Sequence, residues 1–247
     1  PSYLNLLSYI NLFYFALIVA LFHFLAIKLW THKLKKKVQY DGIQKIHEGD
    51  IPRLGGLIIV VSLLIFSCLT ESYQIAHKLR LLIIASTPII FIIFLEDIKQ
   101  NVPTGLRFLA QLLTAILVIV WLPSNLPTTD FFLLDQLFQI DLVRYGFFIV
   151  CLVALMNGMN FIDGANGLMP AFFLSSLLNI GFLTYHLNGD TLLSALSIVF
   201  FIPAAIFLLF NYPLGKIFSG DLGAYLKGLL LGYLVINLFA SQQNASL

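Results

Sequence analysis

Long apolar segments recur from one end of the chain to the other, and short polar stretches separate them. A helix needs about 20 apolar residues to cross roughly 30 Å of hydrocarbon, and most of these segments approach that length. The pattern predicts an all-α polytopic membrane helix bundle that forms a single transmembrane domain over residues 1–247. We place about eight transmembrane helices, at residues 4–30, 54–72, 79–95, 107–122, 142–158, 167–186, 191–210 and 223–240.

The composition supports a membrane protein and excludes several other classes. Hydrophobic residues make up 60% of the chain and charged residues 11%, whereas a soluble domain averages about 45–50% apolar and roughly 25% charged residues. Cys68 and Cys151 lie inside apolar segments without the paired spacing of a metal site or a disulfide framework. We therefore expect the lipid bilayer as a partner and no nucleic acid.

The distribution of Lys and Arg predicts the orientation. The loop at 31–53 carries six of them: Lys33, Lys35, Lys36, Lys37, Lys45 and Arg53. The opposite side carries only Lys78, Arg80 and Arg144. By the positive-inside rule the first loop is cytoplasmic and both termini lie outside. Alternation of the spans then places the loops at 96–106, 158–166 and 211–222 on the cytoplasmic side as well, and the segment 123–141 in the outer interface.

Two polar clusters fall in these cytoplasmic loops. Glu96 and Asp97 are adjacent carboxylates that repel each other unless a cation or solvent compensates them; a solvated helix end is the simpler reading of this pair alone. Between two spans, residues 157–168 contain three Asn and one Asp, which offer hydrogen-bond donors and acceptors to a polar ligand or a metal. A plain turn between helices is the alternative, although turns rarely need so many polar side chains in sequence.

A third cluster, residues 211–223, also opens a span. Its Gly220-Asp-Leu-Gly223 sequence could bind a phosphate through backbone N–H groups. Asp221 could hold Mg²⁺, which favours carboxylates together with substrate phosphate oxygens, or it could be a simple N-cap. Carboxylates that converge from three loops on one membrane face suit a Mg²⁺–diphosphate site.

Four blocks of the chain, in order, match a known family. They are residues 51–56, the Glu96-Asp97 pair with Arg107 and Gln111, residues 157–168 and residues 211–223. The chain resembles the polyprenyl-phosphate N-acetylhexosamine-1-phosphate transferases of glycosyltransferase family four. That superfamily includes undecaprenyl-phosphate GlcNAc-1-phosphate transferases and phospho-N-acetylmuramoyl-pentapeptide translocases. The Pro-Arg-Leu-Gly-Gly form of the first block is similar to the GlcNAc branch.

The resemblance implies a phosphoglycosyltransferase. It would move N-acetylhexosamine-1-phosphate, in the first place GlcNAc-1-phosphate, from a UDP-sugar to polyprenyl (undecaprenyl) phosphate and release UMP. The product would initiate a lipid-linked glycan of the cell wall or of another envelope polysaccharide. The implied cofactor is Mg²⁺, which Mn²⁺ could replace. The implied place is the bacterial inner (plasma) membrane, with the active site on the cytoplasmic side.

The resemblance also implies roles for individual residues. Catalytic roles fall to Glu96, Asp97 and Asp163, and the metal ligands would be Asp221 and Asp163. Phe218 would stack on uracil. The full set of expected substrate-binding residues is Arg53, Asn157, Asn160, Asn166, Asn211, Lys216 and Phe218.

The chain departs from the family pattern at several points. Glu96 replaces the first Asp of a pair, and Asn166 stands where many members have a second Asp. The family's basic, His-rich loop and last helices have no counterpart, so we expect the chain to lack them, as a fragment or an abbreviated relative, and to transfer weakly or not at all. An ion-coupled transporter and a truncated non-catalytic membrane partner remain alternatives. The Gly228-x-x-x-Gly232 spacing leaves a homodimer open.

Overall fold

The computed structural model describes residues 9–29, 51–122, 126–129, 131–188 and 191–245, and over these residues it is all-helical. The predicted fold class is thereby confirmed. The elements are α1 (Tyr9–Leu29), α2 (Gly55–Leu69), α3 (Tyr73–Ala85), α4 (Thr87–Lys99), α5 (Thr104–Trp121), α6 (Phe132–Leu137), α7 (Asp141–Ile162), α8 (Leu168–Leu183), the π-helical turn η3 (Thr184–Asn188), α9 (Thr191–Asn211) and α10 (Gly220–Ala245).

Most of these helices are long and apolar enough to cross a membrane. Among the described residues six pass this test, namely α1, α5, α7, α8 with its extension, α9 and α10, and the pair α3–α4 makes a seventh if it is one span. Helix α2 has 15 residues, which at 1.5 Å per residue gives only about 22 Å. The protein is therefore a polytopic helical membrane protein, although α2 is shorter than expected.

The predicted third span, 79–95, is in fact part of a bent pair. Helices α3 and α4 meet at 56°. Pro88 stands in the first turn of α4 and has no N–H to continue the ladder of helical hydrogen bonds. Instead the hydroxyl of Thr87 donates to the carbonyl of Ile84 at 2.8 Å, and that of Ser86 to Leu82 at 2.6 Å. The helix bends here because proline removes one N–H donor, and the hydroxyl of Thr87 replaces that donor at the carbonyl of Ile84.

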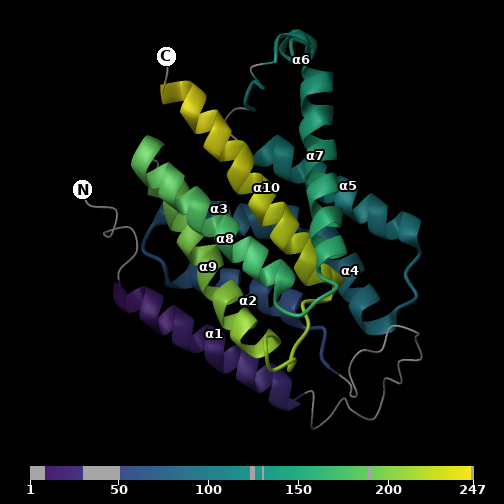
Figure 1. Ribbon diagram of the computed structural model, residues 1–247, viewed down its shortest axis with the longest axis vertical. Helices are drawn as coiled ribbons and strands as arrows, with labels where there is room; N and C mark the ends of the chain where they lie inside the picture. Colours follow the sequence, from purple (N-terminus) through teal and green to yellow (C-terminus); the bar gives the residue numbers. More distant parts are fainter. Residues whose placement is uncertain (1–8, 30–50, 123–125, 130, 189–190, 246–247) are drawn as a thin grey trace.

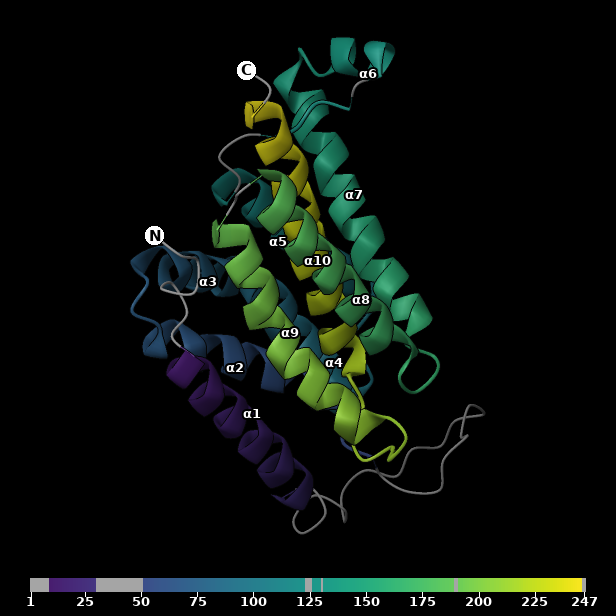
Figure 2. The ribbon, with the colours of Figure 1, turned by 60° about the vertical axis from the view of Figure 1, so that its left-hand side comes forward.

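Helix α10 lies at the centre of the bundle (Figures 1 and 2), in contact with α2, α4, α7 and α8. Every residue from 222 to 234 is buried, as expected of a helix that, apart from Lys227, has apolar or small residues on all sides. A Cβ at Gly228 would stand 2.7 Å from Cα of Met156, and one at Gly232 would collide with Leu152. The Gly-x-x-x-Gly spacing thus packs α10 against α7 within one chain.

The two ends of the bundle differ in character. The turns that follow α4, α7 and α9 lie at one end, and α6 lies at the other (Figures 1 and 2). Around α6 four large apolar side chains are exposed, those of Phe131, Phe132, Leu133 and Leu137, as a segment in a membrane interface requires. The cytoplasmic assignment of the other end stays a prediction, since residues 30–50 of the basic loop lie outside the described part.

Candidate active site

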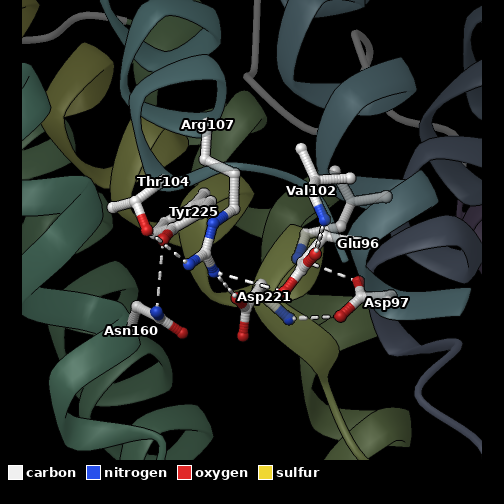
Figure 3. A network of polar contacts seen from close by, with 9 residues as sticks. Glu96, Asp97, Val102, Thr104, Arg107, Asn160, Asp221 and Tyr225 are labelled. Atoms are coloured by element: carbon white, nitrogen blue, oxygen red, sulfur yellow. Dashed lines mark hydrogen bonds and ion pairs between the residues drawn. The ribbon is translucent and has the colours of Figure 1, made fainter. Parts of the chain in front are cut away.

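The start of α10 is held by a carboxylate from another helix. Asp97, near the end of α4, is only 4% exposed. Its Oδ1 accepts the N–H of Asp221 at 2.8 Å, and its Oδ2 accepts the N–H of Leu222 at 3.1 Å (Figure 3). These N–H groups belong to the first turn of α10, where the helix offers them no acceptor. Asp97 therefore caps α10 and fixes the position of Asp221.

Gly220 makes this close approach feasible. Its φ of 70° lies in the left-handed region, which glycine adopts without steric cost. A Cβ at this position would stand 2.6 Å from Oδ2 of Asp97. The Gly-Asp dipeptide at 220–221 and the carboxylate of Asp97 thus form one matched unit.

Arg107 joins two further carboxylates. Its Nη1 lies 3.2 Å from Oδ2 of Asp221 and 3.5 Å from Oε1 of Glu96, while its Nη2 donates to Oγ1 of Thr104 at 3.3 Å. The other oxygen of Glu96 accepts the N–H of Val102 at 2.8 Å (Figure 3). Nε of Arg107 is buried and has no hydrogen-bond acceptor among the described residues. Arg107 therefore offsets the charges of Glu96 and Asp221, and its Nε–H has no acceptor among the described residues.

The first sequence block packs directly on the last. The N–H of Phe218 donates to the carbonyl of Pro52 at 2.9 Å, and Gly55 and Gly56 donate to the carbonyls of Phe218 and Ser219 at 3.0 and 2.9 Å. A Cβ at Gly56 would collide with the backbone of Gly223. This pairing brings Arg53 to the acidic end, and its charge interacts with those of three carboxylates, Asp97, Asp163 and Asp221.

Two of the asparagines hold the site together. Nδ2 of Asn157 donates to Oε1 of Gln111 at 2.6 Å and so links α7 to α5. Asn211 is 4% exposed; its Oδ1 accepts the N–H of Gly167 at 2.8 Å, and its Nδ2 donates to the carbonyl of Ile217 at 2.9 Å. Both polar atoms of Asn211 thus have internal partners, and its contact with a nucleotide stays a prediction.

The other predicted ligand-binding residues lie nearer the surface. Nδ2 of Asn160 donates to the hydroxyl of Tyr225 at 3.3 Å (Figure 3). Asn166 lies beside Gly215: a Cβ added to Gly215 would stand 3.6 Å from Nδ2 of Asn166. Lys216 is exposed and Phe218 is partly buried. The roles of these four residues toward a substrate stay predictions.

Asp163 has the least occupied carboxylate of the cluster. It follows the last turn of α7 and is partly buried, and its side chain makes no hydrogen bond or ion pair with any described residue. Burial raises the pKa of Asp163 to about 6, an effect that the charges of Lys227 and Arg53 oppose and that of Asp221 reinforces. This carboxylate is therefore available to a cation.

The donor set fits a metal that is completed by substrate. No group of three or more His, Cys, Asp or Glu side chains within the described ranges is arranged to enclose a metal ion. Mg²⁺ does not need such a cage, because it is commonly held by one or two carboxylates together with substrate phosphates. Asp163 makes no direct contact with a described side chain, and the charge of Asp221 acts on it. These two carboxylates supply such a pair of ligands.

Three further polar residues fall outside the expected set of site residues, although Gln111 belongs to the second matched block. Gln111 is 2% exposed and accepts from Asn157, Tyr225 accepts from Asn160, and Lys227 is fully buried. The available signal was their place in or beside apolar segments, since polar and ionisable groups inside a span usually serve function.

Comparison with known proteins places the chain among membrane transferases. Residues 79–239 match the profile of glycosyl transferase family 4. The chain is 28% identical over 193 residues to a probable undecaprenyl-phosphate N-acetylglucosaminyl 1-phosphate transferase of Bacillus subtilis (strain 168), which covers 77% of this chain and 51% of the relative. It is 28% identical over 221 residues to a phospho-N-acetylmuramoyl-pentapeptide-transferase of Wolbachia pipientis wMel, with 81% and 67% covered.

A third relative is the decaprenyl-phosphate N-acetylglucosaminephosphotransferase of Mycolicibacterium smegmatis, 27% identical over 216 residues, with 79% of this chain and 52% of the relative covered. The chain thus spans about half to two thirds of the length of these relatives. The family match covers most of the chain and includes the acidic site from Glu96 to Asp221. The chain belongs to glycosyl transferase family 4, the family that the four sequence blocks predicted.

Proposed function

We propose that this protein transfers an N-acetylhexosamine 1-phosphate, in the first place GlcNAc-1-phosphate, from a UDP-sugar to a polyprenyl phosphate and releases UMP. The reaction would start a lipid-linked envelope glycan at the cytoplasmic face of a bacterial plasma membrane. The observation that carries the proposal is the convergence of Glu96, Asp97, Asp163 and Asp221 with Arg107 at one end of the bundle. Family membership supports it.

Asp163 and Asp221 would hold Mg²⁺ against the diphosphate of the UDP-sugar. The metal, or Mn²⁺ in its place, would offset charge on the departing UMP, which is the usual contribution of a divalent ion in phosphoryl transfer. Capping by Asp97 holds Asp221 ready for this role. Asp163 brings a carboxylate that no described side chain occupies.

Positive and polar groups around Asp163 and Asp221 would bind the rest of the UDP-sugar. The guanidinium of Arg107 has a buried Nε without an acceptor among the described residues, and arginine presents its donors in a planar fork that matches phosphate oxygens. Arg53 and Lys216 would add charge toward the diphosphate. We assign Phe218 to stacking on uracil, and Asn160 and Asn166 to hydrogen bonds with the nucleotide or the sugar.

The acceptor phosphate would be the nucleophile. One of its oxygens forms a bond to the β-phosphorus, and the bond from that phosphorus to the α–β bridging oxygen breaks, so that UMP leaves with the electron pair. A phosphate is already anionic near neutral pH, so a strong general base is unnecessary. This agrees with Asp97, whose two oxygens both accept backbone N–H groups. We therefore propose that Asp97 positions α10 and does not take a proton from the substrate.

The location of the charged groups does not favour a transporter. Glu96 and Asp97 lie at the end of α4, Asp163 follows α7, and Asp221 lies in the first turn of α10. Transporter sites commonly lie near the middle of the membrane, between broken helices. An acidic cluster at the helix ends is better suited to a substrate that enters from water and an acceptor whose head group lies at the surface.

Substitution of the two proposed metal ligands tests the function. We expect Asp163→Asn and Asp221→Asn each to lower Mg²⁺-dependent release of UMP from UDP-GlcNAc in the presence of polyprenyl phosphate by at least ~100-fold, because a catalytic metal contributes several kcal/mol. Asp135→Asn, which alters a carboxylate at the opposite end in α6, is the matched control. Activity within a few-fold of wild type in either variant would remove that residue from the metal site.

A further inference from the structure

Lys227 is a charged residue fully enclosed in the centre of the bundle. It lies on α10, and none of its surface is exposed. Its Nζ donates to Oγ of Ser219 at 2.6 Å and lies 4.6 Å from the centre of the Phe207 ring. Ionisable groups inside a spanning helix are energetically unfavourable unless they are hydrogen-bonded, and they usually serve function. The hydrogen bond to Ser219 shows where Lys227 can act on the rest of the molecule.

Ser219 is the last residue of the loop between α9 and α10. It is 1% exposed and directly follows Phe218, the residue that we assign to stacking on uracil. Gly223 lies four residues from both Ser219 and Lys227. A Cβ at Gly223 would collide with Oγ of Ser219, so glycine leaves the space in which that hydroxyl accepts from Lys227. The bond from Lys227 therefore fixes the residue next to Phe218.

Two other parts of the bundle hold the same loop. The N–H of Phe218 donates to the carbonyl of Pro52, just before α2, at 2.9 Å. Nδ2 of Asn211, the last residue of α9, donates to the carbonyl of Ile217 at 2.9 Å. Lys227 adds a contact from α10, and a charged donor makes a stronger hydrogen bond than a neutral one. Residues 217–219 are thus attached to α9, α10 and the segment before α2, with Phe218 in the middle.

We propose that Lys227 is a positioning residue for nucleotide binding: its ammonium fixes Ser219 and thereby holds the Phe218 ring ready for the base of a uridine nucleotide. A binding loop that is ordered before its ligand arrives loses less conformational entropy on binding. Lys227 is fully enclosed, so it acts on the ligand through Ser219 and Phe218. This inference rests on the proposed function, because it takes Phe218 as the stacking residue.

The first test follows amide hydrogen exchange of the purified protein in detergent, without ligand. We expect Ser219→Ala and Lys227→Met each to speed exchange of the loop amides at 215–218 by at least ~5-fold, because a hydrogen bond from a charged donor is lost. Exchange at 224–234, deeper in α10, should not accelerate. Ser197→Ala, which removes a buried hydroxyl bonded within its own helix α9, is the matched control. Loop exchange at the wild-type rate in Ser219→Ala, or equal acceleration along α10, would overturn the positioning role.

The second test measures the affinity for UMP. We expect the Kd to rise at least ~5-fold in Lys227→Met and in Ser219→Ala, because part of the binding free energy then goes into ordering the loop. The double variant should bind UMP about as weakly as the single ones, since both remove the same hydrogen bond. In a Phe218→Leu background, Lys227→Met should have no further effect. A wild-type Kd in both single variants would overturn the proposal. Wild-type protein that binds UMP but releases none from UDP-GlcNAc would count against the proposed function only, since neither test needs turnover.

Discussion

At the scale of single residues, the four carboxylates of the acidic site differ in their partners. The two oxygens of Asp97 accept two backbone N–H groups. Glu96 accepts the N–H of Val102 and forms an ion pair with Arg107, which also pairs with Asp221. Asp163 makes no direct contact of this kind with a described residue. Hydrogen bonds and opposite charges stabilise an ionised carboxylate. Because Asp163 has neither kind of direct contact with a described residue, its carboxylate is the one most open to a ligand.

Arg107 lies against two of these carboxylates, Glu96 and Asp221. We expect Arg107→Met to lower UMP release by at least ~100-fold, because it removes a phosphate-binding cation and leaves Glu96 and Asp221 uncompensated. Arg107→Lys should retain part of the activity, since it keeps the charge but loses the fork of donors. Arg80→Met, at the opposite end where Arg80 donates to the carbonyl of Ser67, controls for loss of a cation. If Arg107→Met is as active as this control, Arg107 does not bind the substrate.

Sequence reasoning identified the residue types of the site better than their contacts. The pair Glu96-Asp97 and the loop containing Asp163 stood out because polar groups interrupted apolar segments. That Asp97 caps α10 could not be foreseen, since the bond joins residues 124 positions apart and depends on the packing of α4 against α10.

At the scale of elements, the start of α10 decides where Asp221 points. We predict that Asp97→Asn lowers the free energy of unfolding by about 1–3 kcal/mol, because its amide would turn a donor toward one of two buried N–H groups. The melting temperature should fall, while the pH dependence of the residual transfer keeps its shape. A normal melting temperature together with a shifted pH profile would instead indicate that Asp97 exchanges a proton with the substrate.

The contact between α7 and α10 depends on small residues. We expect Gly228→Ala to cost about 1–3 kcal/mol of stability, because overpacking of a close contact has that magnitude and the new Cβ would press on Met156. Gly146→Ala, on α7, is the matched control, since a Cβ there meets nothing within 4 Å. The loss should appear as a lower melting temperature with unchanged oligomeric mass. An unchanged melting temperature with a changed mass would assign Gly228 to a contact between chains.

The helices themselves were largely predictable, because apolar segments of sufficient length have few alternatives in a bilayer. The predicted spans at 4–30, 142–158 and 191–210 correspond to α1, α7 and α9. The bend between α3 and α4 was not predicted, although Pro88 was visible. Proline alone does not decide between a kink and a break. Here the hydroxyl of Thr87 donates to the carbonyl of Ile84, which lacks the N–H of residue 88.

At the scale of the whole molecule, the two ends of the bundle expose different kinds of side chain. The acidic site occupies one end, and the exposed aromatic residues around α6 occupy the other (Figure 1). The alternation of spans predicted that three acidic or Asn-rich loops share a face, and the contacts of Asp221 with Asp97 and Arg107, and of Asn211 with Gly167, agree with it. Which side of the membrane this face occupies stays a prediction from the basic loop.

Labelling of single cysteines in intact cells tests that orientation. With Cys68 and Cys151 replaced by Ser, we expect Ala165→Cys to be protected from an impermeant thiol reagent added outside, and Gln136→Cys, on exposed α6, to react. Both positions should react after the membrane is permeabilised. Labelling of Ala165→Cys in intact cells would place the acidic site on the outer side, where a cytoplasmic UDP-sugar has no access.

The most direct test of the proposed function is UMP release that depends on both substrates. Membranes that contain the protein are supplied with UDP-GlcNAc, polyprenyl phosphate and Mg²⁺, and UMP is quantified against membranes that contain Asp221→Asn. We predict that release requires polyprenyl phosphate, is abolished by chelation of the divalent ion, and is lost in the variant, because Asp221 at the capped start of α10 would hold the metal. Release that proceeds without polyprenyl phosphate, or equally in Asp221→Asn, would contradict the assignment of this site to sugar-phosphate transfer.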